Sequence, residues 1–491
     1  MAATVCWPAY YSRPVRRVQW IALFVVAGCG DNLGSDARDP FAPQPDASEG
    51  LTNVSVDLDR LIEQGALVGA CSRYFAGEAE GQRARLLCGK EMFFYESFDT
   101  VGAPAALVDH LVTSFPDELG AGFERYGMVR APDSPVGLPL GLADTVPLDE
   151  GGEVAGYAFT CASCHFARLP DGRYAVGAPN HAYDYGRQIL AMAVYPSLAL
   201  GLSAAEDHAP EVVAAVQPLL DHHAEDAAVQ SALVEAVTAL APLGSVPALG
   251  RDVEAYHASW ASGTQDFIIA PLPLDDGVHI VSKIIDLWGI PDGAEQAAAG
   301  MPHAMLAWTG GAPSLSDFLA GFAIVGGQEP WSAERLAPLA DYIATLRAPD
   351  NPEPPDPALV ADGEELFTAA GCADCHGGPR GSGTRLFDFQ EIGTDAAMAR
   401  WLDPDGDGEP CCEVELVARL TGKLKAPRLT GMWAKRRFLH NGSLASLDEL
   451  FCLDGPRPAV DQQPWATGGH AMTCELPVGD KRALIAYLLA H

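Results

Sequence analysis

Two copies of the pattern Cys-x-x-Cys-His occur in this chain of 491 residues. The first comprises Cys161, Cys164 and His165, and the second comprises Cys372, Cys375 and His376. Thiols at this spacing reach the vinyl groups of a haem, and the residue that follows turns an imidazole toward the iron. The pattern therefore predicts two covalently bound c-type haems, each with one histidine as an iron ligand.

Two other chemistries also use closely spaced cysteines. A thioredoxin-like redox pair needs a βαβ setting, and the sequence around FTCASCHFA and GCADCHGG lacks that pattern. A zinc site needs two further ligands at matching spacing. Haem attachment is therefore the interpretation that both motifs favour.

The first 28 residues resemble a lipoprotein signal peptide. Three arginines precede VQWIALFVVAG (18–28), an apolar run too short to span a membrane. VAGC resembles a lipobox, which predicts lipidation of Cys29 and a flexible tether over 29–50. An ordinary signal peptide is the alternative. Gly30, rather than Asp, follows the cysteine. We therefore expect an exported protein on the periplasmic side of the outer membrane or on the cell surface.

Export would place the remaining cysteines in an oxidising compartment. Six of the twelve cysteines belong neither to the leader, nor to the lipid anchor, nor to the two motifs: Cys71, Cys88, Cys411, Cys412, Cys452 and Cys474. They predict three disulfides. The short step from Cys71 to Cys88 predicts one local bridge, whereas the pairing of the other four stays open.

Composition limits the class of partner. The net charge is −34, from 65 acidic and 31 basic residues, and 48% of residues are hydrophobic. These values predict a globular protein that does not bind nucleic acid, since phosphate binding needs a positive surface.

A linker rich in proline and aspartate, APDNPEPPDPA (348–358), predicts a boundary between an N-terminal domain (51–347) and a C-terminal domain (359–491). The C-terminal domain begins with an amphipathic helix that runs directly into the second motif. Its expected apolar face consists of Leu359, Leu366 and Phe367.

A weak internal repeat connects the two halves. LADYIATL closes the first, and LIAYLLAH closes the second, with Leu484, Ile485 and Leu488 on one face. The predicted fold is mainly α, with two cytochrome c-like haem domains that carry long loop insertions. A chance likeness between short apolar helices is the alternative.

The segment KLKAPRLTGMWAKRRFLHNGSLASLDELF (423–451) resembles a signature of bacterial di-haem cytochrome c peroxidase-like proteins, most closely the branch that includes the haem-dependent rubber oxygenase. EIGTD (391–395) and GGHAMTCELPVGDKRALIAYL also resemble that branch. The resemblance runs well over 340–491, loosely over 155–340, and is absent before 150.

The resemblance implies that His470, within Gly469-His470, is the distal ligand of the second haem. Thr473 replaces a glycine of the family pattern. Met432 and Met472 are the alternative ligands. His440, in LHNGS, is expected to brace haem propionates or loop backbone.

No distal motif is visible for the first haem. The candidate ligands are His181, Met192, His257, His279, Met301, His303 and Met305. The resemblance implies a reactive haem here with an apolar or aromatic distal pocket, which Phe267, Trp288 or Trp308 could line. DPDGDG (403–408) begins like a calcium loop, but the twelfth position is Val414 rather than glutamate. An acidic turn is therefore the favoured interpretation, and a nonstandard calcium site is the alternative.

These features predict an exported di-haem oxidoreductase of peroxidase or oxygenase type. The C-terminal haem would transfer electrons, while a more open N-terminal haem would bind peroxide or dioxygen, or hold dioxygen against an organic substrate. A periplasmic protein would donate or accept the electrons, and only the lipid would contact the membrane. The alternatives are a non-catalytic di-haem electron carrier and, less favoured, a surface lipoprotein in which haem is structural.

Overall fold

The computed structural model describes residues 46–63, 65–98, 103–105, 109, 113, 126–130, 139–147, 153–190, 198, 210, 213–214, 260–266, 281–291, 306, 308–312, 314–325, 331–394, 423–457 and 467–491. The predicted signal peptide, the lipidation site Cys29 and most of the tether lie outside these residues.

Helices dominate the described residues, so the prediction of a mainly α fold is confirmed at that level. The helices before the linker are α1 (Leu58–Leu61), α2 (Ala70–Phe75), α3 (Gln82–Tyr95), α6 (Cys161–His165), α7 (Tyr185–Ile189), α13 (Leu315–Val325) and α14 (Ala333–Ala344). Those after it are α15 (Pro357–Ala369), α16 (Ala373–His376), η5 (Pro379–Gly381), α17 (Phe389–Ile392), η6 (Met432–Ala434), α20 (Leu447–Leu450), α21 (Met472–Glu475) and α22 (Val478–Leu489).

Short antiparallel sheets, which the sequence did not predict, connect these helices. The strands are β1 (Val54–Ser55), β2 (Ala103–Pro104), β3 (Val129–Arg130), β4 (Pro139–Leu140), β5 (Leu142–Pro147), β6 (Glu153–Phe159), β7 (Phe166–Arg168), β8 (Tyr174–Val176), β9 (Thr264–Asp266), β10 (Val281–Lys283), β11 (Leu386–Phe387) and β12 (Leu424–Lys425). They pair as β1-β8-β7, β2-β6-β5, β3-β4, β9-β10 and β11-β12.

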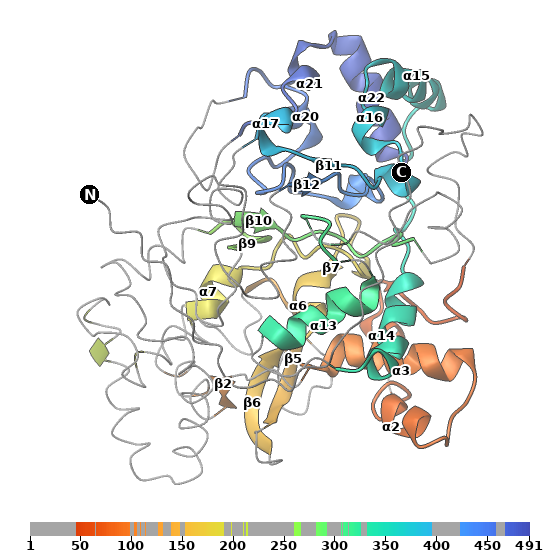
Figure 1. Ribbon diagram of the computed structural model, residues 1–491, viewed down its shortest axis with the longest axis vertical. Coiled ribbons are helices and arrows are strands. Elements are labelled where there is room, and N and C mark those ends of the chain that lie inside the picture. The colour runs from red at the N-terminus through yellow and green to blue at the C-terminus, as the bar shows by residue number, and fades with distance from the viewer. Residues whose placement is uncertain are drawn as a thin grey trace, which may run out of the picture.

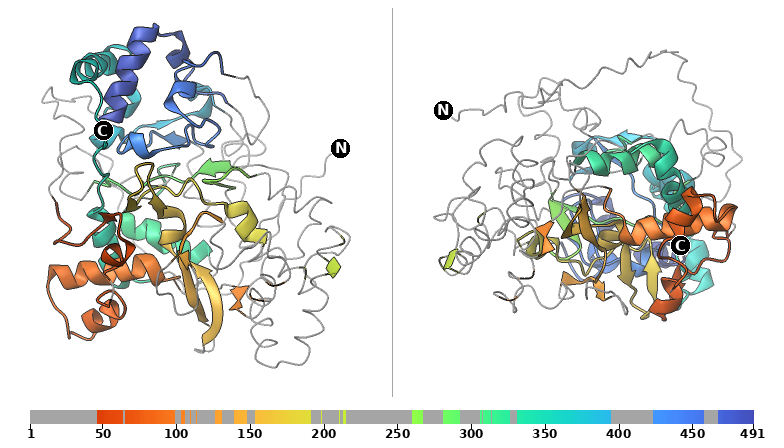
Figure 2. Two further views of the ribbon diagram at one scale, coloured as in Figure 1. Left: turned by 180° about the vertical axis from the view of Figure 1, so that it is seen from behind. Right: turned by 90° about the horizontal axis from the view of Figure 1, so that it is seen from below.

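The elements from α15 onward gather at one end of the molecule, and α2, α3 and α14 lie at the other (Figures 1 and 2). Each end has its own hydrophobic core. The first is built mainly from residues before the linker and the second from residues after it. The boundary predicted at 348–358 stays a prediction, because residues that follow the linker also pack in the first core.

Two helix pairs repeat the same contact. In α3, a side-chain carbon on Gly89 would lie 2.0 Å from the Pro338 carbonyl oxygen and 2.6 Å from the Tyr342 Cβ of α14. In α15, one on Gly363 would lie 2.1 Å from the Ala483 carbonyl oxygen and 2.7 Å from the Tyr487 Cβ of α22. Only glycine permits so close an approach between helices.

Aromatic contacts extend the likeness between the pairs. Phe93 lies four residues after Gly89 and meets Tyr342 at 6.1 Å between ring centroids, while Phe367 lies four residues after Gly363 and meets Tyr487 at 5.2 Å. The internal repeat therefore includes α3, whose sequence GKEMF matches GEELF of α15. Sequence reasoning missed α3 because a long insertion separates it from the first Cys-x-x-Cys-His motif.

The linker is tied down on both sides. Trp433 Nε1 donates to the Pro349 carbonyl at 2.8 Å, and Asn351 Nδ2 donates to the Leu489 carbonyl at 2.9 Å. Helix α15 already begins at Pro357, inside the expected linker, because the Asp356 side chain caps its amides. Leu359 is 40% exposed, so its predicted place on the apolar face is wrong.

Two disulfides join described elements. Cys71–Cys88 links α2 to α3 and confirms the predicted local bridge. Cys452–Cys474 links the residues after α20 to α21. Cys411 and Cys412 lie outside the described residues.

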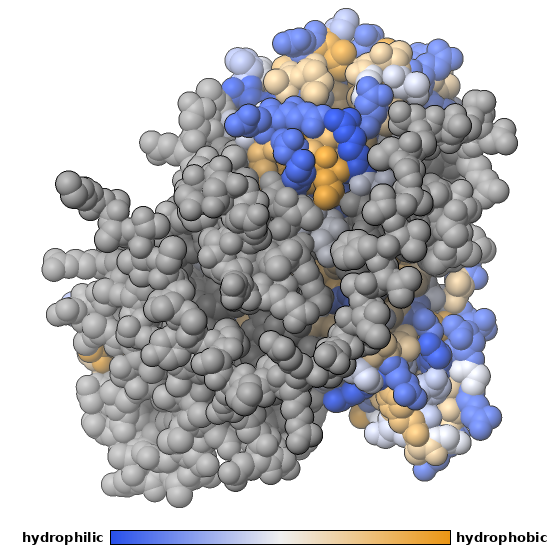
Figure 3. All heavy atoms as spheres, viewed as in Figure 1, coloured by the Kyte–Doolittle hydropathy of each residue, from blue (hydrophilic) through white to orange (hydrophobic). Residues whose placement is uncertain are grey.

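The described surface that Figure 3 shows mixes hydrophilic and hydrophobic residues. Among the helices described, none combines the length and the apolar character that crossing a bilayer requires.

Candidate haem sites

The second motif follows α15 directly. Cys372 is the N-cap of α16, and His376 is the last residue of that helix. His376 Nδ1 lies 2.7 Å from the Gly381 carbonyl oxygen. Because a carbonyl can only accept, Nδ1 carries the proton and Nε2 keeps its lone pair for a metal.

His470 stands opposite His376. The ring centroids are 6.4 Å apart and the ring planes are inclined by 35°. His470 has φ +52°, and the preceding Gly469 has φ +100°. A left-handed conformation at a residue other than glycine persists only where its surroundings impose it.

The chain around His470 supplies that constraint. Arg457 donates to the Gly469 carbonyl at 2.7 Å and to the His470 carbonyl at 3.0 Å. Thr473, where the related pattern has glycine, donates its hydroxyl to the His470 carbonyl at 2.7 Å. The disulfide of the next residue, Cys474, anchors the same loop to α20. Arg457 had no signal in the sequence, because its role depends on where the loop folds.

The distance between the two rings fits a metal ion held between them. Bonds from a metal to imidazole nitrogen measure about 2 Å, and adding the radius of each ring gives a centroid separation of about 6 Å. His470 Nδ1 is buried without a hydrogen-bond partner. Burial lowers the pKa of His376 and of His470 to about 4. Both imidazoles are therefore neutral at pH 7, as ligands must be.

The alternative ligands are placed differently. Met472 is 57% exposed, whereas Met432 packs in the second core. His440 is buried, with Nδ1 3.1 Å from Thr394 Oγ1, and its carbonyl accepts the Lys283 amide at 2.8 Å. These contacts brace the loop that contains His440.

The first motif forms α6, between β6 and β7. The His165 carbonyl accepts the Gly177 amide at 2.7 Å, and the Cys164 carbonyl accepts the Asn180 amide at 2.8 Å. His165 Nδ1 is buried without a hydrogen-bond partner. Burial lowers its pKa to about 4, although the Ile285 carbonyl acts in the opposite direction. A buried neutral imidazole with an orphaned nitrogen again fits a metal ligand.

The motif cysteines differ from the other cysteines that the structure describes. All four motif thiols are free, while the others form disulfides. Burial raises the pKa of Cys161 and of Cys164 to about 12. A catalytic redox pair needs a lowered thiol pKa, so this environment suits thioether attachment better than thiol exchange. No group of three or more metal-ligating side chains was found in the described parts of the chain.

One candidate sixth ligand of the first haem, His181, lies among the described residues. His181 Nδ1 accepts the Arg436 amide at 2.8 Å, and Nε2 lies 3.3 Å from the Ile284 carbonyl oxygen. Both nitrogens are therefore used, and His181 connects the two halves of the chain. The other candidates, Met192, His257, His279, Met301, His303 and Met305, lie outside the described residues. So do Phe267 and the acidic segment 403–408.

Trp288 is fully buried. Its Nε1 donates to the Val176 carbonyl at 2.9 Å, next to the residue that bonds to His165. A side-chain carbon on Gly431 would lie 2.6 Å from the far edge of the indole. Trp288 thus contacts one chain segment from each half of the molecule.

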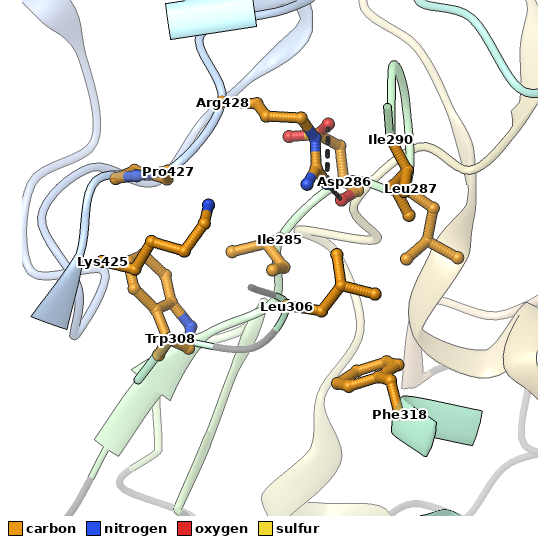
Figure 4. Close-up of a pocket in the computed structure, with 10 residues that line it drawn as sticks. All are labelled: Ile285, Asp286, Leu287, Ile290, Leu306, Trp308, Phe318, Lys425, Pro427 and Arg428. Atoms are coloured by element: carbon orange, nitrogen blue, oxygen red, sulfur yellow. Dashed lines mark hydrogen bonds and ion pairs between the residues drawn. The ribbon is translucent and has the colours of Figure 1, made fainter. Parts of the chain in front are cut away.

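Trp308 lines a pocket that also includes Leu287, the residue before Trp288 (Figure 4). Its walls are mainly apolar: Ile285, Leu287, Ile290, Leu306, Phe318 and Pro427. Asp286, Lys425 and Arg428 supply its polar side, and the Lys425 side chain extends toward the interior in Figure 4. The Ile285 carbonyl acts on His165, so the pocket adjoins the first motif.

No protein family and no curated protein match this chain by sequence. Two solved structures resemble it weakly. A MauG-like protein associated with microbial copper homeostasis is 19% identical with a TM-score of 0.23, and the match covers 35% of this chain and 58% of that one, less than two thirds of its length. Hydrazine synthase of Kuenenia stuttgartiensis is 18% identical with a TM-score of 0.28, over 48% of this chain and 79% of that one. Likenesses this weak establish neither fold nor function.

Proposed function

We propose that this protein is an exported di-haem c-type cytochrome that acts as an oxidoreductase of peroxidase or oxygenase type. The facing pair His376 and His470, 6.4 Å apart between ring centroids, is the observation that carries the proposal. The free motif thiols, in a chain whose other described cysteines form disulfides, support it further. Haem at each motif would supply one-electron redox chemistry.

The two sites would differ in access. His376 and His470 would hold the second iron from both sides and leave no position for a substrate, which suits electron transfer. At the first site, His165 supplies one ligand, and His181, the described candidate for the other, is already hydrogen-bonded at both ring nitrogens. Peroxide, or dioxygen with an organic substrate, would bind there.

Trp288 would connect the two sites. It contacts the backbone just before Gly177 in the N-terminal half and just before Met432 in the C-terminal half. The leader implies lipidation at Cys29 and a place on the periplasmic side of the outer membrane or on the cell surface, with a periplasmic redox partner. A di-haem electron carrier is the second candidate. The two candidate functions differ only in whether the iron of the first haem has a position at which an external ligand can bind.

Absorption and EPR spectra of the purified full-length protein test the proposal. After denaturation, haem should remain covalently bound through both motifs. His470→Ala should convert the second haem from low-spin to high-spin, because one axial ligand is lost. Met472→Ala, a change at an exposed neighbour, serves as the matched control and should leave the spectrum unchanged.

Three outcomes would count against parts of the proposal. Protein that contains no covalent haem rejects it entirely. A low-spin second haem in His470→Ala rejects His470 as the ligand and favours Met432 in its place. If carbon monoxide leaves the spectrum of the reduced wild-type protein unchanged and peroxide leaves that of the oxidised protein unchanged, both irons are closed and the electron carrier is the correct interpretation.

A further inference from the structure

A group of buried cations lies between the two motifs, although the whole chain carries a net charge of −34. Lys425, Arg428 and Lys435 are less than a tenth exposed, and Lys283 is half-buried beside them. We call these four residues the basic cluster. Asp286, 4% exposed, is the carboxylate within it: Lys435 Nζ lies 2.8 Å and the Arg428 guanidinium 3.9 Å from its oxygens.

The other two cations have no carboxylate partner among the described residues. Lys425 Nζ donates to the Ser382 hydroxyl and, at 3.2 Å, to the Ala426 carbonyl. Lys283 Nζ donates to the Arg437 carbonyl at 3.1 Å and lies 5.6 Å from the centroid of the Trp308 ring. These contacts satisfy hydrogen bonds. The Asp286 charge also acts on both lysines, but one carboxylate does not balance the four cations of the cluster.

An excess of positive charge in a protein interior is costly, because the cations lose their hydration and have too few anions to pair with. Burial and the Arg428 charge together lower the pKa of Lys425 to about 7, although the Asp286 charge acts in the opposite direction. Burial and the Lys435 charge lower the pKa of Lys283 to about 7 against the same opposing charge. The cluster therefore has the features of an anion site whose anion is buried with it.

Its position limits what that anion is. Lys425 Nζ donates to the hydroxyl of Ser382, the residue after Gly381, whose carbonyl accepts from His376. Arg428 donates to the Asp286 carbonyl at 2.9 Å. The next residue, Leu287, donates its amide to the Gly177 carbonyl, and the Gly177 amide donates to the His165 carbonyl. The charge of Lys283 acts on His470. One cluster thus adjoins the expected ligands of both irons. Lys425 and Arg428 line the pocket together with isoleucine, leucine, phenylalanine and tryptophan side chains (Figure 4). Cations next to apolar walls complement the edge of a porphyrin, which carries carboxylates on an apolar ring.

We propose that the basic cluster is a shared seat for propionate groups of both haems, with Lys425 and Lys283 pairing with the propionates and Asp286 holding Lys435 and Arg428 in position. This inference rests on the function proposed above and extends it. Positive charge beside the propionates would favour the reduced, less positive state of each iron and so raise its reduction potential.

The test measures reduction potentials of the full-length, haem-loaded protein by optical spectroelectrochemistry. Lys425→Met should lower the potential of at least one haem, while Lys425→Arg, which keeps the charge, should stay close to the wild type. Lys423→Met is the matched control: it removes a lysine two residues away that is 46% exposed and pairs with Asp388. It should leave both potentials unchanged.

Equal potentials in Lys425→Met and Lys423→Met would overturn the inference and assign the counter-charge to a protein carboxylate. Should Lys425→Met fail to fold, resonance Raman spectra of the wild-type protein decide the question. Propionate bands typical of ion-paired carboxylates support the seat, and bands typical of water-exposed carboxylates refute it. Protein without haem would instead reject the proposed function, so the two failures are distinguishable.

Discussion

Replacing Gly363 by alanine tests the helix contact that positions the second motif. The added carbon would lie 2.1 Å from the Ala483 carbonyl oxygen, where ordinary contact begins at 3.4 Å. Helices α15 and α22 would therefore have to separate by about 1 Å, because the obstacle is backbone and cannot rotate away. Helix α15 leads directly to Cys372, so the displacement would reach the site.

The expected loss follows from two opposing effects. Overpacking a close contact costs about 1–3 kcal/mol, and a backbone obstacle places this site at the upper end of that range. Alanine recovers up to about 1 kcal/mol of helix propensity over glycine. We expect the free energy of unfolding to fall by about 2 kcal/mol.

Denaturant titration, followed by circular dichroism and by haem absorption, measures this loss. Gly479→Ala is the matched control, because it lies in α22 with no atom within 4 Å of the added carbon. It should be as stable as the wild type or slightly more so. Gly89→Ala, 2.0 Å from the Pro338 carbonyl oxygen, should behave like Gly363→Ala if the two helix pairs are equivalent. A Gly363→Ala protein as stable as Gly479→Ala would refute the close contact.

Two further predictions concern the Cys452–Cys474 disulfide and His181. Replacing Cys452 and Cys474 by serine should lower the free energy of unfolding by about 3 kcal/mol, because the loop that the disulfide closes is released. The same change should raise the high-spin fraction of the second haem. Serines at Cys71 and Cys88 should leave the spectrum of that haem unchanged. A low-spin second haem in both would contradict the role of the Cys474 loop. Burial lowers the pKa of His181 from 6.5 to about 3. As the pH falls, His181 is therefore protonated in the unfolded chain at a higher pH than in the folded protein. Stability should be steady above pH 6.5 and fall by up to about 1.4 kcal/mol per pH unit as the pH drops toward 3. Denaturant midpoints measured between pH 7 and pH 5 should fall less in His181→Asn than in the wild type. An equal fall in both proteins would contradict the role of His181.

Several features were readable from the sequence because they depend on residues close together in the chain. The Cys-x-x-Cys-His spacing lies within one helical turn, so α6 and α16 carry their motifs wherever they pack. The bridge from Cys71 to Cys88 was predicted for the same reason. The repeat GKEMF and GEELF was also present in the sequence, but recognising it required knowing that α3 packs on α14.

The tertiary structure decided which distant residues meet. His470 faces His376 only because Arg457 and the Cys474 disulfide hold a loop in a left-handed conformation that no local preference favours. The basic cluster joins β10 to β12 and the segment that follows β12, and its cations are ordinary lysines and arginines in the sequence. Their burial, and with it their chemistry, depends on how the two halves pack together.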